Sequence, residues 1–138
     1  MEVSCRCSEI EIQRYKNRLS NPFLDRIDIH VTMQNVALSD TSDVTSSQLH
    51  HKVLETIAFI ATRGQKNFNG KLNDEEIETY CIMDDEAKES LENAVHRFAL
   101  SFRAIKKVQK VARTIADLDQ SNIIGKKDIL EALSYRHR

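Results

Sequence analysis

The chain contains one proline, Pro22, and three glycines, so few of its residues could interrupt a helix. Proline and glycine are the residues that fit a helix interior least well. Apolar residues recur at helical spacing through most of the sequence after residue 46, a pattern typical of helices that bury one face. The sequence therefore predicts a mainly α-helical fold.

Five helices are predicted in this later part of the chain, each from an apolar stripe and most with a residue that can cap the first turn. We expect them over residues 47–63, 73–80, 85–99, 102–118 and 126–135, with caps at Ser46 or Ser47, Asn73, Asp84 and Ser101. The residues expected to point inward include Leu49, Val53 and Ile57 in the first helix and Ile129, Leu130 and Leu133 in the last. Because the stripes can face one another, this part is predicted to form a small bundle that folds by itself.

The first 35 residues follow a different pattern. Residues 8–19 predict a helix capped by Ser8, and Pro22 should end it because proline disfavours helix in the residue before it. Residues 27–33 alternate apolar and polar side chains, which predicts a strand with one buried face. A single strand is unstable without partners, and the rest of the chain offers none. We interpret residues 1–35 as the remnant of a larger α/β unit.

A short polar segment rich in turn-forming residues separates the two parts. It covers residues 36–45 and includes Ser39, Asp40, Ser42 and Asp43. The predicted organisation is therefore residues 1–35, a linker over residues 36–45, and a helical domain over residues 46–138.

Composition excludes several classes of protein. No run of about 18 apolar residues is present, so no membrane span is predicted, and the charged N-terminus lacks the apolar stretch of a signal peptide. Three cysteines, an odd number, do not suggest a secreted disulfide framework, so we expect a cytoplasmic setting. The net charge of −1 excludes a molecule that clamps DNA with its whole surface.

Several motifs occur in an order that resembles one family. They are CRCS at residues 5–8, RLSNPFLDRIDIHV at 18–31, SFRAIKKVQKVARTIADLD at 101–119 and EALSYR at 131–136. Together they resemble the magnesium-chelatase-like AAA+ ATPases, and most closely their bacterial competence-protein branch. The resemblance implies the C-terminal helical lid of the AAA+ fold, preceded by a helix and a strand from the end of the α/β nucleotide-binding core.

The family resemblance implies ATP and Mg²⁺ as cofactors of the full-length protein, and a ring of neighbouring identical subunits as its assembly. DNA is a further partner expected of the competence branch, in a role in recombination. The phosphate-binding loop of the family, G-x-x-x-x-G-K-[ST], does not occur in this chain. We therefore interpret the sequence as a C-terminal fragment that holds no cofactor and hydrolyses no ATP alone.

Two arginines match functional positions of the family. Arg26, in LDRID, matches the arginine finger, which acts on the nucleotide of a neighbouring subunit. Arg103 matches the lid arginine that reaches the nucleotide of its own subunit, and its place in the first turn of a helix opposes the helix dipole. The ordinary alternatives are an ion pair of Arg26 with Asp25 or Asp28, and a solvated Arg103.

The helix predicted over residues 102–118 carries basic residues along one side: Arg103, Lys106, Lys107, Lys110 and Arg113. A solvated face is the commonest meaning of such a stripe, and an acidic neighbouring subunit is another. DNA phosphates are a third possibility, in which Lys106, Lys107, Lys110 and Arg113 make the contacts. Arg113 could instead pair with Asp117 four residues later.

The cysteines suggest half of a metal site at most. Cys5 and Cys7 form a C-x-C pair, and a zinc site normally needs four ligands. We expect free thiols in this chain and a possible four-cysteine zinc site in the full-length protein, as the family pattern implies. Cys81 is expected to be a small core residue.

Two other functions remain open at this point. The chain could come from the motor subunit of magnesium chelatase, which drives metal insertion into protoporphyrin. It could also be a non-enzymatic helical adaptor that binds a protein or DNA through the basic stripe.

Overall fold

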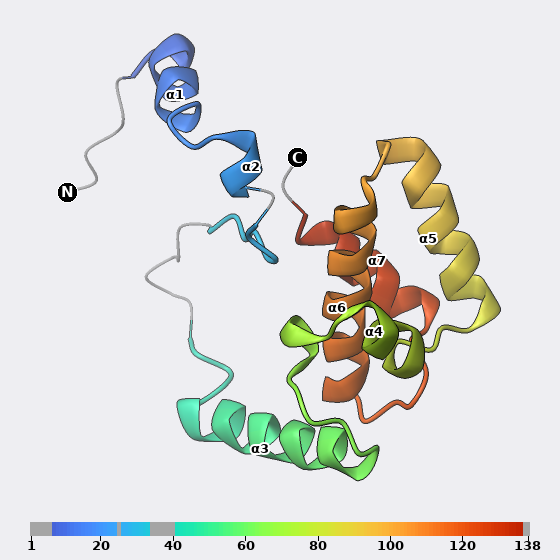
Figure 1. Ribbon diagram of the computed structural model, residues 1–138. Helices are drawn as coiled ribbons and strands as arrows, with labels where there is room; N and C mark the ends of the chain where they lie inside the picture. Colours follow the sequence, from blue (N-terminus) through green and yellow to red (C-terminus); the bar gives the residue numbers. More distant parts are fainter. Residues whose placement is uncertain (1–6, 25, 34–40, 137–138) are drawn as a thin grey trace.

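The computed structural model describes residues 7–24, 26–33 and 41–136 (Figure 1). Within these ranges it contains seven α-helices and one 3₁₀ helix, which confirms the mainly α-helical prediction. The first two helices are α1 (Glu9–Lys16) and α2 (Asn21–Leu24). They are followed by α3 (Ser46–Thr62), η1 (Asn69–Lys71), α4 (Asp74–Tyr80), α5 (Asp85–Phe98), α6 (Phe102–Leu118) and α7 (Lys126–Ser134).

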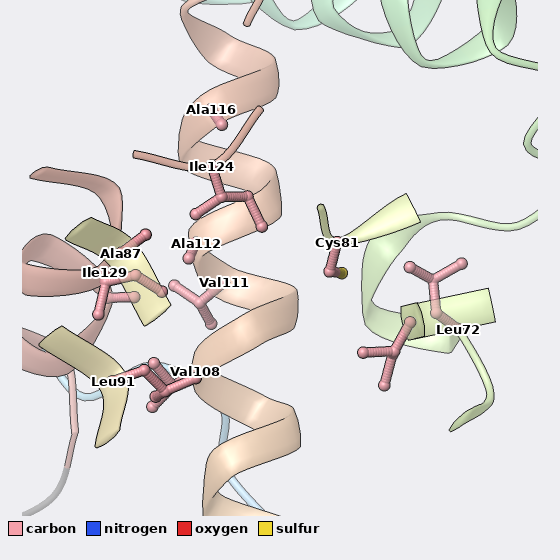
Figure 2. Packing of buried hydrophobic residues seen from close by; sticks show 12 residues of the cluster. Leu72, Cys81, Ala87, Leu91, Val108, Val111, Ala112, Ala116, Ile124 and Ile129 are labelled. Atoms are coloured by element: carbon pink, nitrogen blue, oxygen red, sulfur yellow. The ribbon is translucent and has the colours of Figure 1, made fainter. Parts of the chain in front are cut away.

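Helix α6 lies at the centre of the fold. It contacts α7, η1, α3 and α4, and α5 packs against α7 on the far side (Figure 1). The apolar core, shown in Figure 2, comes from residues 72–132 and includes Ile77, Leu91, Val108, Ala112, Ile124 and Ile129. Residues 1–35 contribute no buried apolar side chain to it among those described.

The predicted helix caps explain where several helices begin. Asn73, Asp84 and Ser101 each accept a hydrogen bond from a backbone N–H in the first turn, at 2.9, 2.7 and 3.2 Å. At α3 the prediction was wrong, because the cap is Thr45, whose hydroxyl accepts a hydrogen bond from the Gln48 N–H. The Gln48 side chain in turn accepts a hydrogen bond from the Thr45 N–H at 2.8 Å, which completes a capping box.

The segment after α6 is fixed by backbone hydrogen bonds to the α4–α5 connection. The N–H of Ile124 donates to the carbonyl of Ile82 at 2.8 Å, and the N–H of Asp84 donates to the carbonyl of Ile124 at 3.1 Å. These bonds form a parallel bridge between Met83 and Ile124. Since the side chain of Ile124 is fully buried, the connection belongs to the core.

The strand predicted over residues 27–33 is not formed. These residues form no regular secondary structure, and the part of the chain that the structure describes supplies no strand for them to pair with. They lie instead near α6 and α7, where the N–H of His30 donates to the carbonyl of Tyr135 at 2.8 Å. The apolar side chains of Ile29 and Val31, expected to be buried, remain exposed.

The region around Pro22 also differs from the prediction. Ser8 caps α1 as expected, but the helix ends at Lys16, before the proline. Pro22 lies inside the short helix α2. The first turn of a helix has no acceptor for its N–H groups, so proline is tolerated there.

Helix α3 packs less closely than its sequence pattern predicts. Leu49, Val53 and Ile57 are 58%, 49% and 41% exposed, and Thr56 is the one residue of the helix that is buried. In α7, Ile129 is buried as expected, whereas Leu130 is exposed. The bundle is therefore built mainly from η1 and α4–α7. None of the helices described has the length and apolar character needed to cross a bilayer.

We predict that residues 46–138 unfold cooperatively when produced without residues 1–45, because the apolar core lies within residues 72–132. Thermal unfolding followed by far-ultraviolet circular dichroism and by tyrosine fluorescence should give coincident transitions, with the whole chain as the control. Transitions that differ between the two probes would show that the domain boundary is misplaced. Residues 36–40 of the predicted linker lie outside the described ranges.

Candidate functional site

Arg26 follows α2 and its side chain is exposed. One guanidinium nitrogen, Nη1, donates to the carbonyl of Pro22 at 3.1 Å, which orients the side chain along the short helix. Of its two possible acidic partners, Asp28 forms no ion pair with it and Asp25 lies outside the described residues. Among the described residues, the guanidinium of Arg26 therefore has no carboxylate as an ion-pair partner.

Arg103 is the second residue of α6, and its side chain is exposed. The first turn of α6 contains no acidic residue, although helix N-termini favour negative charge. The guanidinium and the unpaired N–H groups of the first turn together make this end of α6 electropositive. No carboxylate in the described ranges forms an ion pair with Arg103.

The remaining basic residues of α6 contact other parts of the chain. Lys106 lies 3.9 Å from a carboxylate oxygen of Asp74. The ammonium of Lys107 donates to the carbonyl of Ile27 at 2.5 Å, and that of Lys110 to the carbonyl of Gly70 at 3.3 Å. The stripe predicted from the sequence is therefore largely engaged within the molecule.

Arg113 does not reach the surface at all, because its side chain is 0% exposed. A buried Arg113 cannot contact DNA phosphates, so this interpretation of the sequence was wrong for Arg113. The alternative, a pair with Asp117, is confirmed: the Nε of Arg113 donates to the Asp117 carboxylate at 3.1 Å.

Asp117 is the centre of a buried polar cluster that joins four segments. Both of its carboxylate oxygens accept hydrogen bonds from Arg63, just after α3, at 2.5 and 2.7 Å. Asn69, in η1, donates to the same carboxylate at 2.7 Å. Arg113, which also bonds Asp117, donates to the carbonyls of Ser121 and Asn122 in the connection after α6.

The charges of this cluster are not fully balanced, since two guanidiniums share one carboxylate. Burial lowers the pKa of Arg113, and the negative charge of Asp117 opposes this shift, while the positive charge of Arg63 adds to it. The carbonyls of Ser121 and Asn122 supply the remaining acceptors for Arg113. The cluster is therefore a structural centre of the helical domain.

The cysteines differ in their surroundings. Cys7 is exposed, and Cys5 lies outside the described residues, so the zinc site of the full-length protein stays a prediction. Among the described residues, no group of three or more His, Cys, Asp and Glu side chains is placed to hold a metal ion. Cys81 is buried in the core, as predicted, and burial raises the pKa of its thiol to about 11.

Two family models match: magnesium chelatase, subunit ChlI C-terminal, over residues 43–136, and magnesium chelatase, subunit ChlI, over residues 1–41. Competence protein ComM of Haemophilus influenzae is 40% identical over 136 residues, which cover 95% of this chain and 26% of that protein. The uncharacterized protein YifB of Escherichia coli is 35% identical over 139 residues, covering 95% and 27%. The chain thus spans about a quarter of the length of these relatives.

We predict that Asp117→Asn strongly destabilises the helical domain. The change leaves the buried guanidinium of Arg113 and the partly buried one of Arg63 without a counter-charge, and removing one partner of a buried ion pair typically lowers the free energy of unfolding by about 3–5 kcal/mol. Urea unfolding followed by circular dichroism measures the loss. The matched control is Asp119→Asn, which removes a surface pair with Lys127 and should change little. Equal effects of the two changes would contradict a structural role for the cluster.

We also predict that Cys81 resists thiol reagents until the domain unfolds. In a variant with Cys5→Ser and Cys7→Ser, Cys81 is the remaining thiol. A pKa of about 11 makes the reactive thiolate about a hundredfold rarer at pH 8 than in the unfolded chain. Labelling by a disulfide reagent, with and without urea, tests the protection; equal rates would contradict it.

The fold favours the neutral thiol of Cys81 over the thiolate. The stability that burial of this thiol contributes is therefore present below pH 9 and is lost as the pH rises through about 11.

Proposed function

The chain belongs to the magnesium chelatase subunit ChlI family, and on this premise we propose that it is the C-terminal part of an ATP-driven motor of the competence-protein branch. The relative with the name of a competence protein supports the branch. Since the chain corresponds to about a quarter of that relative, the activity belongs to a longer protein. In this proposal residues 46–138 form the helical lid, and residues 1–35 are the end of the nucleotide-binding core.

The residues of this chain fit only the outer part of a nucleotide site. Its glycines are at positions 64, 70 and 125, too far apart to form a loop whose N–H groups surround a phosphate. In a full-length protein, ATP with its Mg²⁺ ion would supply the phosphoryl group that is transferred to water. The chain would contribute guanidinium groups that approach the triphosphate from outside.

Arg103 is proposed to bind the nucleotide of its own subunit. Its guanidinium and the N-terminus of α6 carry positive charge at the same exposed place, where a phosphate would be stabilised by both. Burial of Asp117 with Arg63 and Arg113 fixes α6 to its neighbours, so a force on Arg103 would move the lid as one body.

Arg26 is proposed to act on the nucleotide of the next subunit in a ring. An arginine in that role neutralises charge that develops on the γ-phosphate, and it raises turnover by about 10³–10⁵-fold. The observation that carries the proposal is a contrast among the arginines. Arg63 and Arg113 are both bound to Asp117, whereas Arg26 and Arg103 are exposed and form no ion pair with any described residue. Other exposed arginines, such as Arg97, share this exposure, and the family motifs around Arg26 and Arg103 single these two out.

Two other functions are less well supported. A motor subunit of magnesium chelatase would use the same two arginines, and the description of the matching family favours it. A non-enzymatic adaptor that binds DNA through the stripe of α6 would need Lys106, Lys107 and Lys110 at the surface. The contacts of these lysines with Asp74, Ile27 and Gly70 weigh against it.

We predict that Arg26→Ala and Arg103→Ala each abolish most ATP turnover in the full-length protein, and that a mixture of the two variants regains part of it. In a mixed ring, a subunit with Arg103 intact can receive Arg26 from a neighbour, so a complete site forms. Steady-state ATPase rates of the separate and mixed variants measure this, with Arg97→Ala, an exposed arginine of α5, as the control. Failure of the mixture to regain turnover would contradict the division of roles between own and neighbouring nucleotide.

A further inference from the structure

Lys107 lies one helical turn after Arg103, on the same side of α6. Its ammonium donates a hydrogen bond to the carbonyl of Ile27 at 2.5 Å, and this contact is partly buried. Ile27 directly follows Arg26 in the sequence. A single side chain, one turn after Arg103, therefore connects α6 to the carbonyl of the residue that follows Arg26.

A second hydrogen bond holds the same segment a few residues later. The N–H of His30 donates to the carbonyl of Tyr135, the residue that ends α7, at 2.8 Å. Between the two attachments lies a cavity of about 100 Å³, lined on one side by Ile27, Asp28 and His30 and on the other by Ala104, Lys107 and Val111. The hydrogen bonds at Ile27 and His30 therefore hold residues 27–30 against the helical domain, beside a small cavity.

Of these two hydrogen bonds, we expect the one from Lys107 to hold residues 27–30 more strongly. A hydrogen bond from a charged donor is about twice as strong as one between neutral groups, and partial burial reduces the competition from water. The adjacent Lys106 differs, because its ion-pair partner is the exposed carboxylate of Asp74, at 3.9 Å. The two lysines thus have the same charge and neighbouring positions but different attachments.

We propose that Lys107 is a positioning residue that couples Arg26 to the lid. The proposal rests on the function proposed above, in which Arg103 and Arg26 serve two different nucleotides. A movement of α6 caused by the nucleotide at Arg103 is carried by Lys107 to residues 26–30. It thereby changes the position of the arginine offered to the next subunit, and the two sites become mechanically linked.

The attachment itself is tested by amide hydrogen exchange in the chain as it stands. Lys107→Met keeps the apolar stem and removes the donor, so we expect the His30 amide to exchange about tenfold faster or more. Lys107→Arg should restore the protection, and Lys106→Met should leave it unchanged. The same His30 exchange rate in Lys107→Met and in the unaltered chain would overturn the proposal.

The coupling is tested by ATP turnover in the full-length protein. Lys107→Met should lower kcat with little change in the KM for ATP, Lys107→Arg should restore kcat, and Lys88→Met, on the exposed side of α5, should have no effect. A normal kcat for Lys107→Met, when Arg26→Ala has lost turnover, would overturn the positioning role alone. If Arg26→Ala itself retains turnover, the function proposed above fails, while the exchange experiment still reports on the attachment.

Discussion

The carboxylate of Asp117 is buried between two guanidiniums that come from distant parts of the chain, and the arrangement of the helical domain depends on it. Arg63 brings the end of α3 to this point, Asn69 brings η1, and Arg113 holds the connection that follows α6. A buried charge must be matched by partners, since its desolvation is otherwise strongly unfavourable. The cluster therefore permits few alternative placements of these four segments.

Helix α6 combines this fixed region with an exposed end. Its 17 residues span about 25 Å, with Arg113 and Asp117 in the C-terminal half and Arg103 in the first turn. A helix held at one end among packed neighbours transmits displacement along its axis with little bending. In the function proposed above, α6 would therefore carry the effect of a nucleotide at its N-terminus to the domain that surrounds its other end.

The sequence predicted the elements of the fold better than their contacts. Helix positions and the caps at Asn73, Asp84 and Ser101 follow from local patterns, which the fold preserves. The strand over residues 27–33 failed because strand pairing needs partners that local pattern cannot supply. Within the polar cluster, the four-residue spacing of Arg113 and Asp117 had already indicated that the two could form an ion pair. Arg63 lies 54 residues from Asp117, and no periodicity relates the two positions.

The hydrogen bonds that hold residues 27–30 use main-chain atoms at Ile27, His30 and Tyr135. Every residue has a carbonyl and every residue except proline has an N–H, so these three positions tolerate many side chains without loss of the hydrogen bonds. Selection would act on Lys107 alone, and covariation between residues would leave no trace of the contact. Couplings of this kind are recognised from coordinates, because homologous sequences would show at most a conserved lysine without its partner.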